Sequence, residues 1–330
     1  MDKLAIVVVT YKRQELLSEL FDSILASSIA PWRIIVTDNE NSEDTRKLAE
    51  DFAQAVDRRW GRSAPDTETN TRRVVYQAMT ENTGGSGGFN AGVKRAYDLG
   101  AQWFWVMDDD VAIEPDGIEK LDKWTGRHEV IQGQRHNFDG TPFYWQYHFI
   151  VPLGIPDPVA PSGFGHAGYK TMNTVCFEGG LFKRSVVRKI GLPDKRFFIY
   201  WDDTMYGYLA SKLTNPIIVP DFVMRRTRAI GNWNIAGKRK LNSTSDMNRY
   251  HIMRNRGYMA RYFMLYGDYR PVLFGLGTLL TFAKELVRLA MVDKSFKTGV
   301  PALIRGWWDS RAILHDGQWR PMPPLDDKEA

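Results

Sequence analysis

Residues 3–10 read Lys-Leu-Ala-Ile-Val-Val-Val-Thr, and this unbroken apolar, β-branched run decides the fold class of the 330-residue chain. Apolar side chains at every position, rather than at alternate ones, are typical of a strand covered on both faces of a parallel sheet. Similar strands are expected at residues 33–37, 74–79 and 102–107, and helices at 16–25, 42–56 and 88–99. The alternation predicts an α/β fold, an open sheet flanked by helices, with ligands at the carboxyl ends of its strands.

The composition fits a folded protein of a reducing compartment. Hydrophobic residues make up 43% of the chain and charged residues 25%, as in globular proteins. Cys176 is the single cysteine, which excludes an intrachain disulfide and a cluster of thiolate zinc ligands. The first apolar run is too short for a signal peptide and is followed at once by Lys12 and Arg13. We therefore expect a cytoplasmic protein.

The second half of the chain is less regular. Aromatic residues crowd residues 143–149, a short strand is expected at 173–177, a helix at 184–190, and three helical stretches from about residue 248. We expect one domain over residues 1–265 and a helical extension over residues 266–330. The apolar part of residues 271–283 is too short to span a bilayer, so it either packs on the core or another subunit, or lies on a membrane surface.

Positive charge is concentrated between Phe222 and Tyr262, where ten Lys and Arg residues stand against one acid, Asp246. Such a block suits phosphates, anionic lipid or nucleic acid. A solvated helix face and loop is the alternative for each residue taken singly.

The strand predicted at residues 102–107 is followed by three carboxylates, Asp108, Asp109 and Asp110. Side chains alternate along a strand, so Asp108 and Asp110 share a face and Asp109 points elsewhere. Two carboxylates on one face suit a hard divalent ion such as Mg²⁺ or Mn²⁺. A turn of solvated acids is the alternative.

Residues 81–92 read Glu-Asn-Thr-Gly-Gly-Ser-Gly-Gly-Phe-Asn-Ala-Gly and form the second motif. Glycines at a helix start let backbone amides approach an anionic ligand. The motif is no P-loop, because Gly-Lys-Ser/Thr is absent, and Asn90 replaces the last glycine of the dinucleotide-binding pattern.

The third motif, residues 200–203, reads Tyr-Trp-Asp-Asp. An aromatic surface stacks on sugar rings, and a neighbouring carboxylate can take a proton from a hydroxyl. Alternatively, Asp202 caps a helix that runs through Leu209. Each aspartate can serve one of the two roles.

At these motifs the chain resembles the inverting family 2 glycosyltransferases, most closely the bacterial galactofuranosyltransferases, with rhamnosyltransferases next. The resemblance implies the GT-A fold, a Rossmann-like open mixed sheet, over roughly residues 4–265. It is carried by residues 7–13, 35–39, 84–89, 108–110, 178–183 and 201–203.

The resemblance also implies roles for individual residues. Asp108 and Asp110 would hold Mn²⁺ or Mg²⁺, and Asp203, or Asp202 as second choice, would be the catalytic base. The residues implied to bind the nucleotide are Thr10, Tyr11, Arg13, Asp38, Asn82 and Asp109. Those implied to lie beside the donor sugar or acceptor are Gly85, Ser86, Gly87, Gly179, Gly180 and Trp201.

One feature departs from the family pattern. The family usually has a metal-ligating His after the strand that here covers residues 217–224, whereas this chain has Arg225 and Arg226. Arginines can take over part of the charge neutralisation of a diphosphate, so we expect them there. His251, further along the chain, is a third candidate for this place.

The resemblance thus predicts transfer of galactofuranose from UDP-galactofuranose to a hydroxyl of a bacterial surface polysaccharide or lipid-linked glycan. A rhamnosyltransferase using dTDP-rhamnose is the first alternative. A non-catalytic carbohydrate-binding protein is the second, although it has no need of three aspartates. A nucleotidyltransferase is disfavoured, because no Gly-rich basic loop lies near the N-terminus. We expect peripheral membrane contact or a homo-oligomer through the C-terminal helices, and no nucleic-acid partner.

Overall fold

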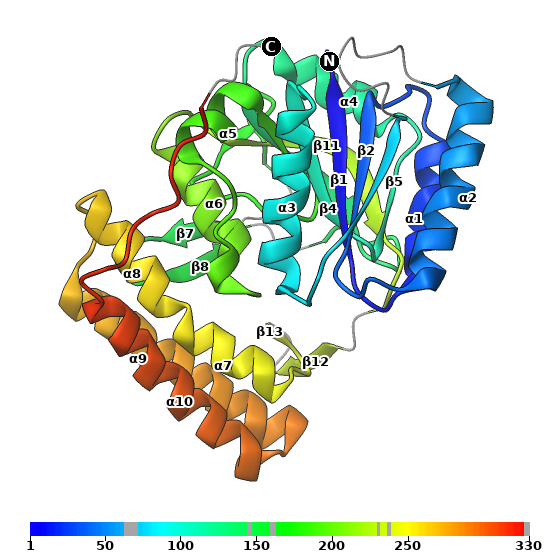
Figure 1. Cartoon of the computed structure of the whole chain (residues 1–330). Helices are drawn as coiled ribbons and strands as arrows, with labels where there is room; N and C mark the ends of the chain where they lie inside the picture. Colours follow the sequence, from blue (N-terminus) through cyan, green and yellow to red (C-terminus); the bar gives the residue numbers. More distant parts are fainter. Residues whose placement is uncertain (63–71, 144–146, 159–162, 230–231, 236–238, 327–330) are drawn as a thin grey trace.

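The computed structural model describes the chain except residues 63–71, 144–146, 159–162, 230–231, 236–238 and 327–330. Its centre is a nine-stranded mixed sheet of order β3-β2-β1-β4-β10-β6-β11-β5, with β9 paired to β11 (Figure 1). Its strands are β1 (Leu4–Thr10), β2 (Arg33–Asp38), β3 (Val74–Ala78), β4 (Trp103–Asp108), β5 (Val111–Ile113), β6 (Val130–His136), β9 (Lys170–Thr171), β10 (Gly180–Lys183) and β11 (Ile217–Arg226). Two hairpins lie outside this sheet, β7 (Tyr147–Ile150) with β8 (Ile155–Pro158) and β12 (Asn232–Ile235) with β13 (Arg239–Asn242).

The helices of the sheet region are α1 (Gln14–Leu25), α2 (Glu43–Trp60), α3 (Gly84–Asp98), α4 (Gly117–Thr125), α5 (Arg184–Ile190) and α6 (Asp202–Ser211), with a 3₁₀ turn at Lys195–Phe197. A layer of helices follows: α7 (Asp246–Arg254), α8 (Arg256–Leu265), α9 (Pro271–Arg288), a π-helical turn at Leu289–Asp293, and α10 (Phe296–His315). The predicted α/β class and open mixed sheet are confirmed.

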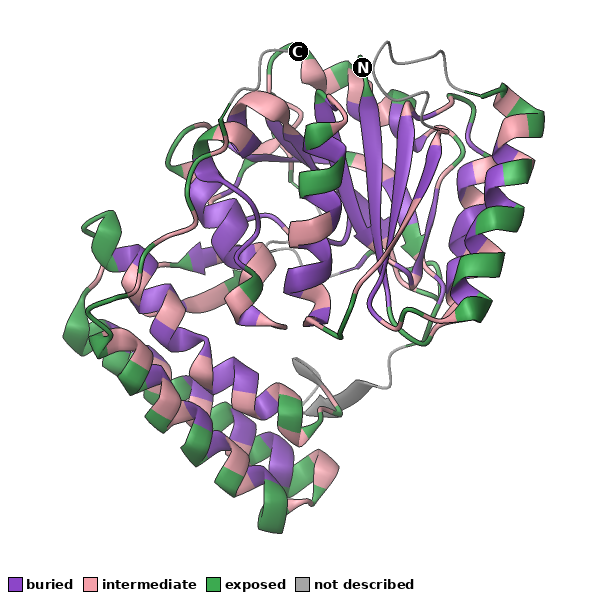
Figure 2. Cartoon of the chain, in the orientation of Figure 1, coloured by how far each residue is buried: buried purple, intermediate pink, exposed green. Residues whose placement is uncertain are grey.

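The first strand explains why the sheet needs two helical layers. The side chains of Ala5, Val7 and Val9 pack in one core cluster with α3, whereas Leu4, Ile6 and Val8 pack in another with α1 and α2. Every residue of β1 is buried. The unbroken apolar run therefore fills two cores at once, as the sequence predicts (Figure 2).

The glycine-rich motif lies within a helix for most of its length, whereas the helix was expected to begin only at Gly88. Helix α3 begins at Gly84, four residues earlier than expected. A Cβ on Gly88 would lie 2.4 Å from Val9 Cγ1, and one on Gly92 would lie 2.6 Å from Val7 Cγ1. These glycines therefore let α3 lie directly against β1.

The helical layer differs from the sequence prediction in two respects. It has four α-helices instead of three, and α7 and α8 pack against α10 (Figure 1). We therefore propose that the extension begins at Asp246 rather than after residue 265. The strand predicted at residues 173–177 does not form, and Asn173 there bonds instead to the backbone of Phe149, at 2.8 Å to both its N and its O. No helix in the described parts of the chain has the length and apolarity needed to cross a membrane.

Part of the basic block serves the interior of the helical layer. Arg256 is fully buried and donates to the carbonyl oxygens of Leu153 and Gly154, at 2.9 and 2.7 Å. Arg249 is almost fully buried and pairs with Asp246 and Asp293. These arginines are structural, in contrast to the solvated or ligand-binding roles that their sequence clustering suggests. The side chains of Lys238, Arg239 and Lys240 lie outside the described residues.

Gly207 provides a test of how α6 is seated on the core. A Cβ there would lie 2.0 Å from the backbone nitrogen of Val175, so Gly207→Ala must move one of the two segments. We expect the free energy of unfolding to fall by about 1–3 kcal/mol in urea denaturation, the usual cost of overpacking. Gly275→Ala is the matched control: it lies inside α9 with no atom within 4 Å, so it should gain up to about 1 kcal/mol. Equal stabilities for the two variants would contradict this packing.

Candidate active site

The candidate site lies where β1, β2 and β4 end. In the sheet register Thr10 is opposite Asp38, and Val9 is opposite Asp108. The strands are parallel, so their polar terminal residues meet at one edge. The structure thus brings together motifs that are a hundred residues apart in the sequence.

Asp109 ties the turn after β1 to the end of β4. Its carboxylate accepts bonds from Thr10 Oγ1 at 2.7 Å and from Arg13 Nη1 at 3.0 Å, and Arg13 also reaches Asp110 at 3.4 Å. Thr10 and Asp109 are each only 2% exposed. Thr10 and Asp109 thus hold this turn in place, and their predicted contacts with the nucleotide stay a prediction. The Tyr11 side chain is exposed.

Asp108 sits in a concentration of negative charge. Its pKa is raised well above the usual value by burial in the protein and then by the charges of Asp110, Glu178 and Asp109. A divalent cation would relieve this repulsion, and carboxylate oxygens are its preferred donors, so the residues fit Mn²⁺ or Mg²⁺. The described residues contain no group of three or more His, Cys, Asp or Glu side chains around a common metal position. Asp108 and Asp110 would therefore leave most positions of an octahedral ion to water and phosphate oxygens.

The two consecutive arginines have separate surroundings. Arg226 pairs with Glu178 through Nε and Nη2, each at 2.7 Å, and Asp110 is among the charges that act on it. Arg135 pairs with the same carboxylate at 2.6 Å. Arg225 points away and pairs with Glu19 at 3.2 Å, because neighbouring strand residues face opposite sides. Arg225 thus makes its ion pair away from Glu178, and its expected diphosphate contact stays a prediction.

A cavity of about 400 Å³, a size typical of small-molecule sites, opens at the same edge of the sheet, among residues that follow β1, β2 and β3. Its lining residues are Tyr11, Lys12, Asn39, Glu40, Met79, Thr80, Glu81 and Asn82. Tyr11 and Asn82 were predicted here, whereas Asn39 and Glu40 were not. Both residues directly follow β2 at the carboxyl edge of the sheet, and this position could have identified them as site residues from the sequence.

Asp38, predicted to contact the nucleotide, does not line this cavity. It is fully buried, and its carboxylate accepts bonds from the backbone nitrogens of Glu40 and Ser42, at 2.8 and 3.1 Å. The Tyr76 hydroxyl donates a further bond at 2.8 Å. Asp38 therefore shapes the loop that presents Asn39 and Glu40.

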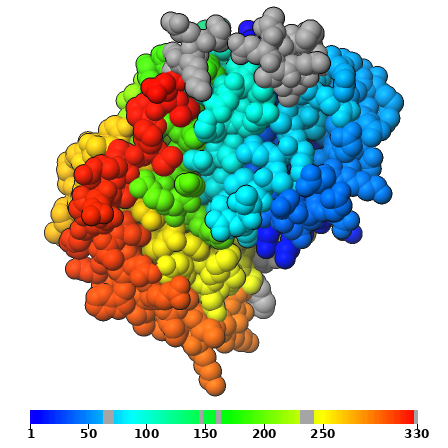
Figure 3. Space-filling model, in the orientation of Figure 1, coloured from blue at the N-terminus to red at the C-terminus, as the bar shows by residue number. Residues whose placement is uncertain are grey.

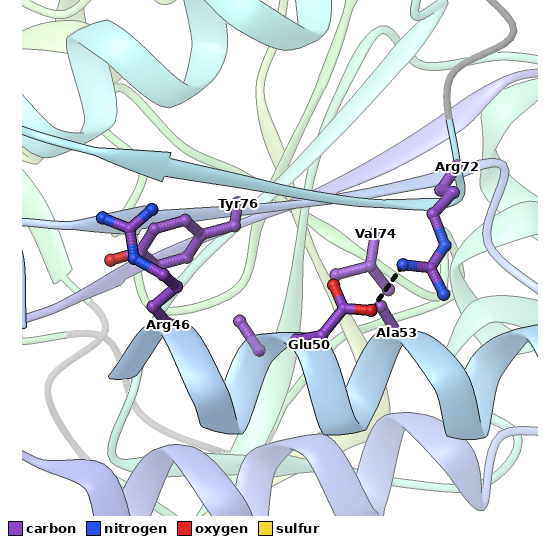
Figure 4. A pocket seen from close by; sticks show the side chains of 7 residues that line it. Arg46, Glu50, Ala53, Arg72, Val74 and Tyr76 are labelled. Atoms are coloured by element: carbon purple, nitrogen blue, oxygen red, sulfur yellow. Dashed lines mark hydrogen bonds and ion pairs between the residues drawn. The ribbon is translucent and has the colours of Figure 1, made fainter. Parts of the chain in front are cut away.

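A second cavity of about 310 Å³ lies between α2 and the edge strand β3 (Figure 4). The Arg72–Glu50 ion pair, 2.8 Å, crosses one end of it, and Arg46 lies beside Tyr76 at the other. It contains none of the predicted site residues, so we assign the site to the first cavity.

The Trp-Asp-Asp motif follows a strained backbone segment. Phe198, Tyr200 and Trp201 have φ angles of 65°, 66° and 69°, a left-handed conformation that costs about 1 kcal/mol or more per non-glycine residue. The fully buried Asn255 holds the segment, since its Nδ2 donates to the carbonyls of Phe197, Ile199 and Tyr200 at 2.8–2.9 Å. Asn255 was missed in the sequence, because nothing local distinguishes it from a surface asparagine.

The helix that carries Asp202 and Asp203 is not capped as predicted. Trp201 is the N-cap residue of α6, and no side chain makes a capping bond. Asp203 Oδ1 accepts bonds from the Thr204 nitrogen and hydroxyl, at 2.5 and 3.1 Å. Burial, followed by the charge of Asp203, raises the pKa of Asp202 to about 7. Burial also raises the pKa of Asp203, opposed by the Thr204 bonds and the charge of Arg135.

The glycine-rich start of α3 meets this motif. The Ser86 nitrogen donates to the Phe198 carbonyl at 3.1 Å, and the Ser86 hydroxyl acts to lower the pKa of Asp202. Gly87 packs on Thr83, whereas a side chain on Gly85 would meet nothing within 4 Å. Of these three residues, Gly85 therefore has the most open surroundings.

The remaining predicted residues are structural in this conformation. Gly179 has a φ of 97° and donates from its nitrogen to Val106 at 2.8 Å, and Gly180 continues into β10. His251 stacks on Phe198, with ring centroids 4.9 Å apart, and is 7% exposed. Burial and the charges of Arg254 and Arg305 lower the pKa of His251 to about 4. It packs against Phe198 of the strained segment, and its expected place at the diphosphate stays a prediction. Trp201, the predicted sugar platform, donates from Nε1 to Ile252 O at 3.1 Å.

The mixed sheet, the acid-terminated β4 and the cavity at the strand ends together have the architecture of the GT-A fold. Solved structures of S. aureus TarS share this fold. Residues 1–349 of TarS align with a TM-score of 0.57 and 12% identity over 95% of this chain and 81% of that one. Its complex with UDP-GlcNAc aligns at 0.54 and 12%, over 94% and 81%.

The chain belongs to glycosyl transferase family 2, whose profile matches residues 5–191, more than half of its length. It is 28% identical over 210 residues to galactofuranosyltransferase GlfT1 of Mycolicibacterium smegmatis, covering 60% of this chain and 61% of that protein. The uncharacterized glycosyltransferase YwdF of Bacillus subtilis is 25% identical over 208 residues, covering 62% and 66%. The match spans about 60% of the length of the galactofuranosyltransferase. The predicted family and the resemblance to galactofuranosyltransferases are confirmed.

The raised pKa of Asp202 predicts how stability depends on pH. Because the folded-state pKa is near 7 and an unfolded Asp titrates near 3.8, the folded state holds the extra proton between these values. The unfolding free energy should therefore fall as pH rises from about 4 to 7. Asp202→Asn mimics the protonated form, so it should stabilise the protein by at least about 1 kcal/mol more at pH 8 than at pH 5. Urea denaturation at both pH values measures this, and a pH-independent difference would contradict the assigned pKa.

Proposed function

We propose that this chain transfers a sugar, galactofuranose first, from a UDP-linked donor to a hydroxyl of a glycan or lipid-linked glycan. The observation that carries the proposal is that Asp108 and Asp110, at and just after the end of β4, lie at the same edge of the sheet as a cavity of about 400 Å³. Family membership supports the reaction class. The likeness to relatives named galactofuranosyltransferases supports the sugar.

The first cavity would receive the nucleoside. Tyr11 offers an exposed aromatic ring, and Asn39 and Asn82 offer amide groups for the base or ribose. The diphosphate would then extend toward Asp108 and Asp110, where Arg13 is 40% exposed and can donate to phosphate oxygens. Mn²⁺ or Mg²⁺, when bound there, supplies positive charge that stabilises the departing nucleoside diphosphate.

We propose that Arg226 neutralises part of the negative charge of the diphosphate. It stands where the family usually has a metal-ligating His. It lies beside Asp110 and is held by Glu178, so its guanidinium is fixed in orientation. A guanidinium fixed next to the carboxylates of Asp110 and Glu178 offsets part of their negative charge without a metal.

Asp203 is the proposed base. Where two adjacent carboxyls share one proton, the proton belongs on the group whose ionised form is less favoured. Asp202 has the pKa near 7, whereas Thr204 and Arg135 favour the ionised form of Asp203. Asp203 would therefore take the acceptor proton as the hydroxyl attacks the anomeric carbon. A single displacement of this kind inverts the anomeric centre.

The metal site is tested by donor binding rather than turnover. In calorimetric titrations, UDP should bind the wild-type protein about tenfold or more tightly with Mn²⁺ than without, as one charge-assisted contact provides. Asp110→Ala should abolish that gain while leaving the fold intact. Asp116→Ala, which removes an exposed carboxylate paired with Lys120, is the control. An unchanged metal dependence in Asp110→Ala would disprove this assignment.

The base is tested by comparing two variants. Asp203→Asn should lower turnover at least about a hundredfold with donor affinity unchanged, the usual scale for loss of a general base. Asp202→Asn should retain most turnover. UDP or dTDP release is measured with UDP-galactofuranose and dTDP-rhamnose in parallel. If only dTDP-rhamnose is turned over, the donor is dTDP-rhamnose and the proposed sugar is wrong. If nucleotide sugars bind but none is turned over, the chain is not a glycosyltransferase. If turnover is lost only in Asp202→Asn, Asp202 is the base and the two roles are reversed.

A further inference from the structure

Helix α9 exposes an apolar stripe over its whole length. Of the residues of α9 that are exposed, only Lys284 is charged. The stripe consists of Val272, Leu273, Leu276, Leu279, Leu280, Ala283 and Val287. Val272 is 85% exposed and Leu279 is 63% exposed. At about 100° per residue these side chains fall within an arc of about 120°, and they extend over about 22 Å of helix.

The opposite face of α9 is fixed on the protein. Phe274, Gly277 and Thr281 are buried there, and a Cβ on Gly277 would lie 1.8 Å from the carbonyl oxygen of Leu153. Arg256 of α8 donates to Thr278 Oγ1 at 2.8 Å. The apolar stripe is therefore held outward on a seated helix. The helical layer to which α9 belongs forms one end of the molecule (Figures 1 and 3).

The exposed charges in the stretch of chain that contains α9 have one sign. Between residues 270 and 305 the exposed charged residues are all basic: Arg270, Lys284, Lys294, Lys297 and Arg305. The two acids of this stretch are turned inward, Glu285 onto Arg288 and Asp293 onto Arg249. On the helical wheel Lys284 lies at the border of the stripe, so at least one cation adjoins the apolar face directly.

We propose that this face of α9 lies on an anionic lipid bilayer, with the leucines among the acyl chains and the basic residues at the headgroups. An apolar face with basic neighbours is the pattern of a helix that lies in the membrane interface. Each exposed cation near an anionic surface adds to the attraction. A second copy of the chain docked on this face would instead bring side chains of the same charge toward one another. The inference depends on neither the proposed donor nor the metal.

The test is flotation of the full chain with vesicles of phosphatidylcholine, alone or with roughly one third phosphatidylglycerol. The wild-type chain should bind the anionic vesicles, bind the neutral ones at least about tenfold less, and be released by high salt. Leu276→Gln/Leu279→Gln should weaken binding to anionic vesicles at least about tenfold, since two buried leucine side chains are lost. Lys284→Gln/Lys297→Gln should lose affinity for anionic vesicles only.

Ile29→Gln/Leu213→Gln is the matched control, because it replaces two aliphatic side chains of 40% and 47% exposure outside the helical layer. It should bind like the wild type, and circular dichroism should show all variants folded. The proposal is overturned by a wild-type chain that ignores anionic vesicles, or by a leucine variant that binds as well as the control. It is also overturned if light scattering shows a dimer that the leucine variant dissociates while vesicle binding stays unchanged, since the stripe would then be a contact between copies.

Discussion

The repulsion between carboxylates at the end of β4 is the constraint on which the site depends. Asp108 lies in protein surroundings that favour its neutral form, and Asp110, Glu178 and Asp109 add to that effect. Two arginines neutralise part of this charge: Arg13 forms ion pairs with Asp109 and Asp110, and Arg226 forms one with Glu178. Asp108 itself has no such ion pair among the described contacts, which is why a divalent cation is the natural complement to this site.

The Asp202–Asp203 pair likewise depends on contacts made by residues distant in the sequence. Its backbone approach is strained at Phe198, Tyr200 and Trp201, and the strain persists because Asn255 bonds three carbonyls of the segment. Asn255 stands between α7 and α8, so the helical layer contributes directly to the shape of the site. The layer is thus more than an attachment surface: its inner side supports the carboxylate pair, and the outer side of α9 carries the apolar stripe.

The fold could be predicted largely from local sequence. Apolar runs such as residues 3–10 read as strands buried on both faces, and their alternation with helices gave the open sheet, since burial periodicity is a local property. The start of the helix at the glycine-rich motif was placed four residues too late. A flexible loop and a helix whose glycines pack against a strand have the same composition, so the sequence does not separate them. Only the approach of Gly88 to Val9 distinguishes them.

For the site, the sequence by itself determined which chemical groups stand at the strand ends: the aspartates after β4, the Trp-Asp-Asp motif, and arginine in place of histidine. It could not determine which of these groups are free. Thr10 is hydrogen-bonded to Asp109, and Asp38 is hydrogen-bonded to the loop after β2. Arg225 and Arg226 face opposite sides of one strand and pair with Glu19 and Glu178. Those outcomes were decided by tertiary structure, because a side chain's availability depends on partners distant in sequence, and their positions are set only when the sheet assembles.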